Sequence, residues 1–213
     1  MKIFHFDVDE AWAKENNELL RDTSRLQLSA VVMGLIFATA GVAAWFLIDN
    51  SSVGLLVLIA ALAVMVLCFI IAWVVPRKVG TAQQLYDTYP LAPAIIAEVN
   101  PRDVVLLALV NTSVDPEAKP RWALATRTVT RLKGHPRTVG TRVPVAAVSG
   151  RRKVSSQGQW DEITPMPIAW GTPDEDIIAA ATKEIPFQQW QIVEKHAGRA
   201  DEVQKTQFSL LEL

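Results

Sequence analysis

Two long runs without an ionisable side chain dominate this sequence of 213 residues. Residues 26–48 and 53–75 are each 23 residues long and contain no Asp, Glu, Lys, Arg or His. A hydrocarbon layer of about 30 Å requires roughly 20 residues of α-helix, so each run is long enough to cross a membrane. The runs argue against a soluble single-domain enzyme, even though the whole chain, with 21 basic and 22 acidic residues, is nearly neutral.

The link between the two runs, residues 49–52, is so short that the two helices must be antiparallel neighbours. Both termini then lie on one side of the membrane. Basic residues flank the runs on that side: Arg21 and Arg25 precede the first, and Arg77 and Lys78 follow the second. By the positive-inside rule this side is the cytoplasm. We expect a multi-pass plasma-membrane protein with a hairpin over residues 26–75 and both termini in the cytoplasm.

Small side chains recur along one face of the first run. Ala30, Gly34, Ala38 and Gly41 are spaced four, four and three residues apart, which places them on one helical stripe. Such a stripe lets another backbone approach closely, either a helix of a partner protein or the second helix of the same hairpin. We therefore predict helix packing at these four residues. Because neither run contains a histidine or a charge, we predict no haem ligand and no ion pathway in the hairpin.

The remaining sequence divides into four segments. The pattern of apolar and charged residues in segment 1–25 predicts an extended start and then an amphipathic helix. Its apolar side chains face either the membrane interface or the C-terminal domain. Residues 76–90 predict a helical connector. Residues 91–171 alternate short β-branched runs with turns, which favours a small antiparallel β-barrel of the SH3 or OB type. Residues 172–213 predict C-terminal helices, the first with Thr172 as its N-cap.

The predicted strands of the barrel are residues 94–99, 104–110, 122–132, 142–148 and approximately 163–168. Pro144 lies within the fourth of these, and since proline cannot donate to a strand ladder it predicts an edge strand or a bulge there. The expected fold class is therefore an α+β membrane protein. It combines an antiparallel two-helix transmembrane hairpin with a small cytoplasmic β-barrel and C-terminal helices.

Charge is distributed unevenly in the part that follows the hairpin. Residues 119–160 contain ten basic and no acidic residues, whereas residues 161–213 contain ten acidic and four basic ones. Basic residues beside an anionic leaflet are each worth about 1 kcal/mol, but they could equally neutralise the acidic tail within the fold. The residues predicted to contact anionic lipids or a partner are Arg121, Arg127, Arg131, Lys133, Arg137, Arg142, Arg151, Arg152 and Lys153. Nucleic acid is not an expected partner, because stacking aromatics are not interleaved with these cations.

Motifs that carry chemistry are absent from the sequence. The glycines are never closer than six residues, which excludes a glycine-rich phosphate loop. The three histidines are more than 60 residues apart, and the single cysteine, Cys68, lies in the second apolar run. We therefore predict no catalytic residue, no metal site, no cofactor and no enzymatic activity.

Two short strings and the hairpin carry a family resemblance. Residues 1–10 (MKIFHFDVDE) and 165–173 (PMPIAWGTP) are similar to an uncharacterised family of two-span membrane proteins from Corynebacterium and related actinobacteria. In size and two-span form the chain also resembles the accessory subunits of the actinobacterial respiratory supercomplex, in which a cytochrome bc complex is joined to an aa3 oxidase. That resemblance implies a peripheral subunit without a cofactor.

The function expected from the sequence is a non-catalytic accessory subunit of a larger integral-membrane complex. The candidate complex is the respiratory supercomplex, with its cytochrome bc and aa3 oxidase subunits as partners. The alternative is a membrane-tethered binding module, an adaptor whose cytoplasmic domain recruits a soluble ligand or protein.

Overall fold

The computed structural model describes residues 1–48, 51–115, 118–153, 156 and 158–213. The expected hairpin turn at Asp49 and Asn50 lies outside the described residues. The chain divides into two compact units. The hairpin unit is Leu19–Gly80, and the sheet unit combines Met1–Glu18 with Thr81–Leu213.

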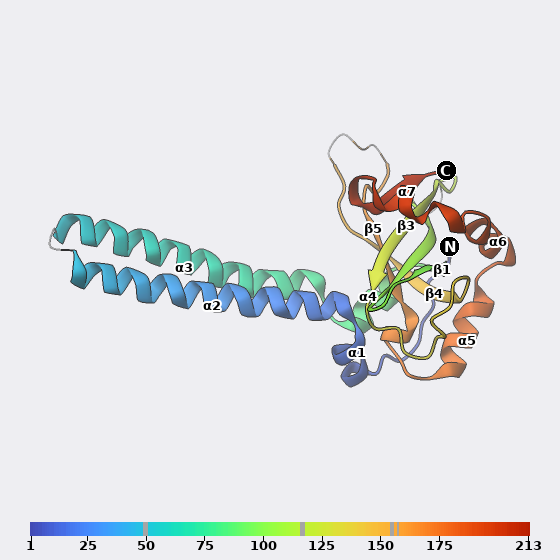
Figure 1. The fold of residues 1–213 in the computed structure, drawn as a ribbon, viewed down its shortest axis with the longest axis horizontal. Coiled ribbons are helices and arrows are strands. Elements are labelled where there is room, and N and C mark those ends of the chain that lie inside the picture. The colour runs from blue at the N-terminus through green and yellow to red at the C-terminus, as the bar shows by residue number, and fades with distance from the viewer. Residues whose placement is uncertain (49–50, 116–117, 154–155, 157) are drawn as a thin grey trace. The chain divides into compact units, whose positions relative to one another are not determined.

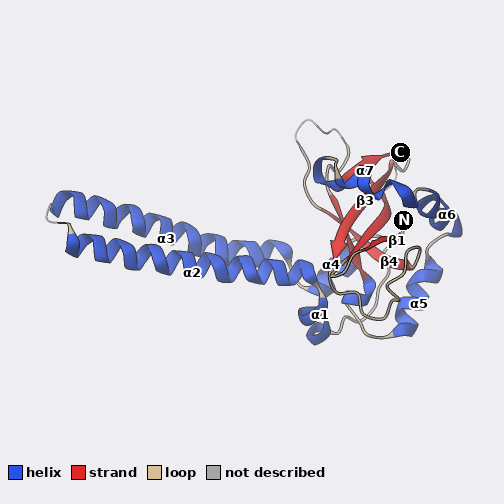
Figure 2. Ribbon diagram, in the orientation of Figure 1, coloured by secondary structure: helices blue, strands red, loops and turns tan. Residues whose placement is uncertain are grey.

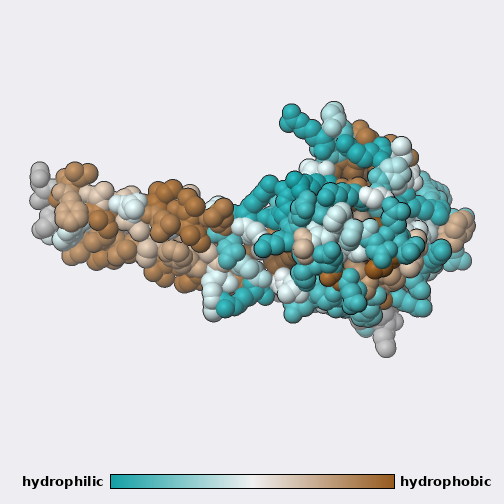
Figure 3. All heavy atoms as spheres, turned by 90° about the horizontal axis from the view of Figure 1, so that it is seen from below, coloured by the Kyte–Doolittle hydropathy of each residue, from teal (hydrophilic) through white to brown (hydrophobic). Residues whose placement is uncertain are grey.

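The hairpin unit consists of two long helices that lie side by side, α2 (Glu18–Leu47) and α3 (Ser51–Val79) (Figure 1). Both are long and apolar enough to cross a membrane. Figure 3 shows hydrophobic side chains over the surface of this unit, and Phe46 and Leu47 are 79% and 82% exposed. Helix α3 ends where Gly80 adopts the left-handed conformation, with φ of 79°. The two candidate membrane helices agree with the prediction from the apolar runs.

The described residues of the sheet unit form six antiparallel strands (Figure 2). They are β1 (Leu91–Val99), β2 (Val104–Asn111), β3 (Trp122–Val129), β4 (Arg142–Ser149), β5 (Ile163–Pro167) and β6 (Leu210–Glu212). Their order in the sheet is β5-β4-β1-β2-β3-β6. The first five strands lie where the sequence predicts them, whereas β6 comes from the C-terminal tail and was not expected.

The sheet is a half-barrel, which corrects the expected SH3- or OB-type barrel. The described strands pair in an open order whose two ends are β5 and β6, although the sheet curls enough for β5 to contact β3. Two features oppose closure. Strand β6 pairs with the edge of β3 at Ala123–Ala125, and β5 contains Pro165 and Pro167, which have no N–H group to donate to a further strand.

Strand β4 lies inside the sheet, between β5 and β1, so the prediction of an edge or a bulge at Pro144 was wrong. Pro144 faces Pro93 of β1, and its pairing with β5 begins only at the next residue, Val145. The missing N–H group of Pro144 therefore falls beyond the last paired residue of β5. An interior strand tolerates proline here because no ladder bond is required from it.

The helices of the sheet unit cover the strands. They are α1 (Glu10–Asn16), α4 (Ala82–Thr88), α5 (Glu175–Glu184), α6 (Phe187–Lys195) and α7 (Ala200–Gln204), with short 3₁₀ turns η1 (Ile168–Trp170), η2 (Ala197–Arg199) and η3 (Gln207–Ser209). Helix α6 packs against β1 and β2, α5 against β4, and α7 against β3. Strand β2 is accordingly buried from Val104 to Val110, on both of its faces.

The first C-terminal helix begins later than predicted. Asp174, not Thr172, is the N-cap of α5, and its side chain accepts a hydrogen bond from the backbone N–H of Asp176. Thr172 is buried, and its hydroxyl accepts a hydrogen bond from the N–H of Asp174 instead. The sequence places two capping residues in one turn, and the tertiary burial of Thr172 decides between them.

The N-terminal segment packs on the strands and helices of its own unit. The Phe6 ring is buried and lies 4.9 Å from that of Tyr86, centroid to centroid. The indole N–H of Trp12 donates to the carbonyl of Ala169 at 2.9 Å. Of the two environments expected for these apolar residues, the structure places them on the C-terminal domain.

Candidate functional site

The predicted small-residue stripe lies on the face of α2 that packs against α3. A Cβ atom added at Gly41 would lie 2.6 Å from the Cβ of Ala61, and one added at Gly34 would lie 3.3 Å from the Cβ of Cys68. Ala30 and Ala38, on the same stripe, are half-buried. The close approach therefore occurs within the hairpin, which was one of the two expected uses of the stripe. A partner helix would have to pack on another face.

Two of the nine predicted basic contacts lie beside helix α1. The Nζ of Lys133 is 3.4 Å from a carboxylate oxygen of Glu15 and 4.5 Å from the centre of the Trp12 ring. The guanidinium of Arg131 is 4.0 Å from the same Glu15 oxygen and donates to the Glu15 carbonyl at 3.3 Å. These cations join the segment after β3 to the N-terminal helix.

Three further cations are also engaged inside the sheet unit. Arg142 donates to the carboxylate of Glu194 at 2.7 Å. Arg127 lies over the ring of Trp170, 4.9 Å from its centre. Arg137 donates to the two backbone carbonyls that close the β1–β2 turn, at 2.8 and 3.1 Å. Each cation therefore has a partner within its own unit.

The last four basic residues lie in the β2–β3 and β4–β5 loops, and we call them the loop cations: Arg121, Arg151, Arg152 and Lys153. A backbone bridge between Ser113 and Gln159 brings the two loops together. Arg121 donates to the side chain of Gln159 at 2.8 Å, and Arg151 lies 3.5 Å from the Glu162 carboxylate. All four loop cations are exposed.

Four of the nine basic residues form ion pairs with other described residues of the sheet unit. Arg142 and Arg151 pair with Glu194 and Glu162 of the acidic segment 161–213, as the neutralisation alternative predicts, whereas Arg131 and Lys133 pair with Glu15 of the N-terminal helix. Exposed pairs of this kind contribute about 0–1 kcal/mol each. A role of the nine residues at lipid or at a partner stays a prediction, and the loop cations are the most accessible of them.

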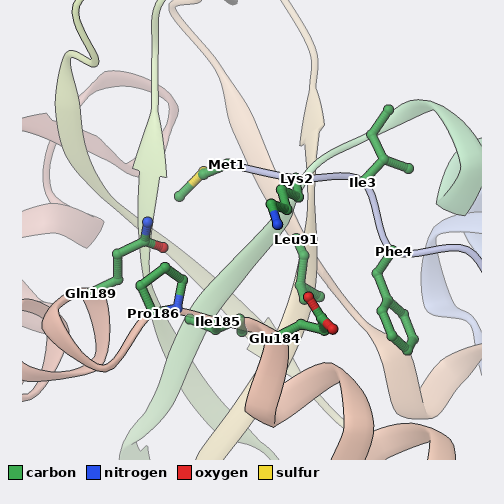
Figure 4. Close-up of a pocket in the computed structure, with 9 residues that line it drawn as sticks. All are labelled: Met1, Lys2, Ile3, Phe4, Leu91, Glu184, Ile185, Pro186 and Gln189. Atoms are coloured by element: carbon green, nitrogen blue, oxygen red, sulfur yellow. The ribbon is translucent and has the colours of Figure 1, made fainter.

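A cavity of about 270 Å³ lies beside the N-terminal segment (Figure 4). Residues 1–4 form one wall, Leu91 contributes from β1, and the joint between α5 and α6 forms the opposite wall through Glu184, Ile185, Pro186 and Gln189. We call it the N-terminal cavity. The sequence analysis did not find it, because its lining residues come from three distant segments and carry no motif.

Hydrogen bonds hold the N-terminal segment against α4 and β1. The carbonyl of Lys2 accepts from the N–H of Leu91 at 2.7 Å, and His5 Nδ1 lies 2.9 Å from a carboxylate oxygen of Asp87. Hydrogen bonds from His5 and then from Gln83 lower the pKa of the Asp87 carboxyl below its usual value. Gln83 also donates to the carbonyl of Phe6 at 3.0 Å. These hydrogen bonds fix the position of the N-terminal segment, which forms one wall of the cavity.

A buried tyrosine anchors the inner end of this segment. The Tyr86 hydroxyl donates to the carbonyl of Pro167 at 2.7 Å, and burial raises the pKa of the phenol far above its usual value. The Tyr86 hydroxyl therefore stays protonated and remains a donor throughout the physiological pH range. Its role is structural, since both partners are buried.

The histidines of the chain contact groups that do not form a catalytic constellation. His135 and His196 each lie within hydrogen-bond distance of a backbone carbonyl, and His5 lies beside Asp87. Across residues 1–48, 51–115, 118–153, 156 and 158–213, no three His, Cys, Asp or Glu side chains cluster closely enough to hold a metal ion. The predictions that the protein has no catalytic residue, metal or cofactor are not tested by this arrangement.

The fold and these contacts define the class of the protein: an α+β sheet domain that follows two candidate membrane helices. The chain belongs to the family described as "Protein of unknown function (DUF3239)", whose profile matches residues 77–201. The matched region starts after the second apolar run and includes strands β1–β5.

One similar solved structure is described as the crystal structure of a "putative membrane protein from Corynebacterium diphtheriae". It is 56% identical in sequence, covers 58% of this chain and 99% of its own, and superposes with a TM-score of 0.56. No curated protein matches the chain. These findings support the expected relation to corynebacterial membrane proteins, and they contain no link to a respiratory supercomplex.

Proposed function

We propose that the protein is a non-catalytic, membrane-anchored accessory component of a larger membrane complex. The hairpin is inserted in the plasma membrane, and the sheet unit lies in the cytoplasm with both termini. The outward surface of the hairpin carries this proposal. Leu28, Phe46 and Trp73 are between 63% and 79% exposed, although isolated soluble proteins rarely expose so many large apolar side chains together.

The ends of the hairpin support the proposed orientation. Arg25 precedes the apolar part of α2, and Arg77 follows that of α3, where its guanidinium lies 3.8 Å from the centre of the Trp73 ring. Arginine beside an interfacial tryptophan is typical of the cytoplasmic end of a membrane helix. The loop cations would then be available to anionic lipid or to the inner face of a partner.

We assign no catalytic reaction to the protein because of what its cysteine and histidine side chains contact. Cys68 lies in α3 against α2, and the three histidines contact carbonyls or a carboxylate. A nucleophile needs a base within hydrogen-bond reach, and these contacts provide no such pair. The size and two-span form of the chain make the respiratory supercomplex the specific complex to test first.

Gentle extraction from native membranes tests the accessory role. The full chain, tagged at its C-terminus, is extracted in a mild detergent and analysed by native electrophoresis and mass spectrometry. We expect stoichiometric co-purification with integral-membrane proteins, among them cytochrome bc and aa3 oxidase subunits if the supercomplex is correct. A matched variant with residues 26–75 replaced by an unrelated two-helix hairpin distinguishes docking through the spans from docking through the sheet unit. Migration of the wild-type protein alone would contradict the proposal.

Cysteine labelling of intact cells tests the orientation separately. In a Cys68→Ser background, a cysteine at Ser52 is expected to react with a membrane-impermeant maleimide, whereas a cysteine at Lys205 is expected to react only after the cells are opened. The reverse labelling pattern would refute the cytoplasmic location of the sheet unit.

A second candidate function is a membrane-tethered binding module. The N-terminal cavity favours it, because a preformed hollow with both apolar and polar lining is typical of small-ligand sites. The two candidates differ in where they require contacts: an accessory subunit requires a protein partner, whereas the module requires a ligand in this cavity.

A further inference from the structure

The N-terminal cavity combines an apolar wall with three polar groups. Met1, Ile3, Phe4, Leu91, Ile185 and Pro186 provide the apolar lining. The polar ends of Lys2, Glu184 and Gln189 are turned toward the space between these walls (Figure 4). The side chains of the cavity therefore offer one cation, Lys2, and one anion, Glu184, to a single occupant.

The three polar groups have no strong partner of their own. Within the described part of the chain, neither Lys2 nor Glu184 belongs to an ion pair, although both line the same cavity. The side-chain oxygen of Gln189 is buried and accepts no hydrogen bond from the described residues. A ligand in the cavity cannot reach that oxygen, whereas the side chains of Lys2 and Glu184 are both exposed and can be reached.

The positions of these groups are set by the fold. Lys2 is held through its carbonyl, which accepts from Leu91, while its side chain extends into the cavity. Glu184 is the last residue of α5, and Gln189 lies in the first turns of α6, so the helix joint sets the distance between them. The site is thus carried by the ends of two helices and by a segment that is hydrogen-bonded to β1, and side chains on regular elements are held more precisely than those on loops.

We propose that the N-terminal cavity binds a small zwitterion with an apolar body, of which a free apolar α-amino acid is the simplest example. The ligand carboxylate pairs with Lys2, and its ammonium donates to the carboxylate of Glu184. The apolar side chain lies against Leu91 and Ile185. A zwitterion suits the cavity because its carboxylate can accept from the Lys2 ammonium while its own ammonium donates to the Glu184 carboxylate, and both contacts are charge-assisted.

The volume is consistent with a ligand of this size. An apolar cavity of about 150 Å³ accommodates benzene. By that measure, 270 Å³ accommodates about ten non-hydrogen atoms, the size of leucine or isoleucine. The ligand class rests on the second candidate function, the binding module, and does not require the protein to belong to a larger complex.

Calorimetric titration of the full chain in detergent micelles tests the proposal, with three probes matched in shape. L-leucine carries both charges, 3-methylbutylamine lacks the carboxylate, and 4-methylpentanoate lacks the ammonium. We expect saturable binding of L-leucine below about 5 mM, and at least about ten-fold weaker binding of each single-charge probe, because each loses one charge-assisted contact.

Four variants assign the contacts. Lys2→Met and Glu184→Gln are each expected to weaken L-leucine binding about ten-fold or more. Lys2→Met should leave binding of 3-methylbutylamine unchanged, since that probe has no carboxylate. The matched controls are Lys14→Met on α1 and Glu175→Gln at the opposite end of α5, both exposed and outside the cavity, and they should bind L-leucine as the wild type does.

Two results would overturn the proposal. One is the absence of saturable heat with L-leucine up to about 5 mM, a range that includes millimolar affinity. The other is L-leucine binding that persists unchanged in both Lys2→Met and Glu184→Gln. Thermal melting of each variant confirms that it is folded. Neither result affects co-purification from membranes, so failure of the ligand site can be distinguished from failure of the accessory role.

Discussion

Substitution of Gly171 by alanine should destabilise the sheet unit strongly, because three distant segments meet at this residue. A Cβ atom at position 171 would lie 2.6 and 3.0 Å from two ring carbons of Tyr86 and 2.9 Å from a ring carbon of Phe6. Ordinary contacts begin near 3.4 Å. Phe6 belongs to the N-terminal segment and Tyr86 to α4, so the added methyl group separates both from the end of η1.

The magnitude follows from how little these rings can move. Tyr86 is 1% exposed and Phe6 is 9% exposed, and the Tyr86 hydroxyl is held by the Pro167 carbonyl at 2.7 Å. Overpacking of a dense core costs about 1–3 kcal/mol, and a strained buried hydrogen bond adds about 1 kcal/mol. We expect Gly171→Ala to lower the free energy of unfolding by about 2–4 kcal/mol. For a unit of this size that corresponds to a fall in Tm of roughly 5–15 °C.

The assay is thermal and urea unfolding of the full chain in detergent, followed by tryptophan fluorescence. Gly198→Ala is the matched control, because a Cβ atom there has no neighbour within 4 Å and the residue does not adopt a left-handed conformation. Its stability should stay within about 1 kcal/mol of the wild type. In a Tyr86→Leu background, Gly171→Ala should cost clearly less, since one of the two rings that the added methyl group meets is gone and it is the nearer one.

A Gly171→Ala variant that is as stable as Gly198→Ala would contradict the predicted steric clash. The clash with Tyr86 would also be contradicted if Gly171→Ala lowered the free energy of unfolding equally with and without the Tyr86 ring. In that case the loss would come from the contact with Phe6 or from the backbone at position 171, and not from the contact with Tyr86.

Three further predictions follow from the charges and from the hairpin. Burial, and then the Asp201 carboxylate, raise the pKa of Glu98, so the charged form of Glu98 destabilises the fold. This destabilisation is absent below the pKa of the unfolded chain, near 4.3, and is complete above the raised pKa of the folded protein. Glu98→Gln should therefore raise the Tm at pH 7 and not at pH 3.5, and an unchanged Tm at pH 7 would refute this. A hydrogen bond from Arg199 lowers the pKa of Glu202, so the charged form of Glu202 stabilises the fold. Glu202→Gln should therefore lower the Tm at pH 7, and this loss should fade as the pH falls below about 4. Gly34→Cys should form a disulfide with Cys68 under a membrane-permeant oxidant, because the two Cβ atoms would lie 3.3 Å apart. Mass spectrometry of the intact chain should show the loss of two hydrogens, and the outward-facing control Ala43→Cys should stay reduced.

Local patterns predicted a large part of the fold. The apolar runs predicted α2 and α3, and β-branched segments between turns predicted β1–β5, because helix length and strand period are properties of short stretches. Strand β6 was missed, since three residues of a tail show no period of their own. Its strand conformation depends on the edge of β3, to which it is hydrogen-bonded.

The candidate sites were less predictable than the elements. The stripe around Gly34 and Gly41 was visible as a spacing, but whether it served the hairpin or a partner required the positions of Ala61 and Cys68. The nine basic residues were visible as a composition, whereas the ion pairs of Lys133 with Glu15 and of Arg142 with Glu194 join segments far apart in the sequence. The N-terminal cavity had no signal at all.

The sequence by itself determined that this chain has two helices able to span a membrane and a strand-rich domain after them. Those properties follow from length, apolarity and turn residues, which act over a few neighbouring positions. Only the tertiary structure decided that the sheet stays a half-barrel, that Arg142 of β4 pairs with Glu194 of α6, and that residues 1–4 form one wall of a cavity with the joint of α5 and α6. Contacts between distant segments depend on how the whole unit packs, and no local pattern encodes them.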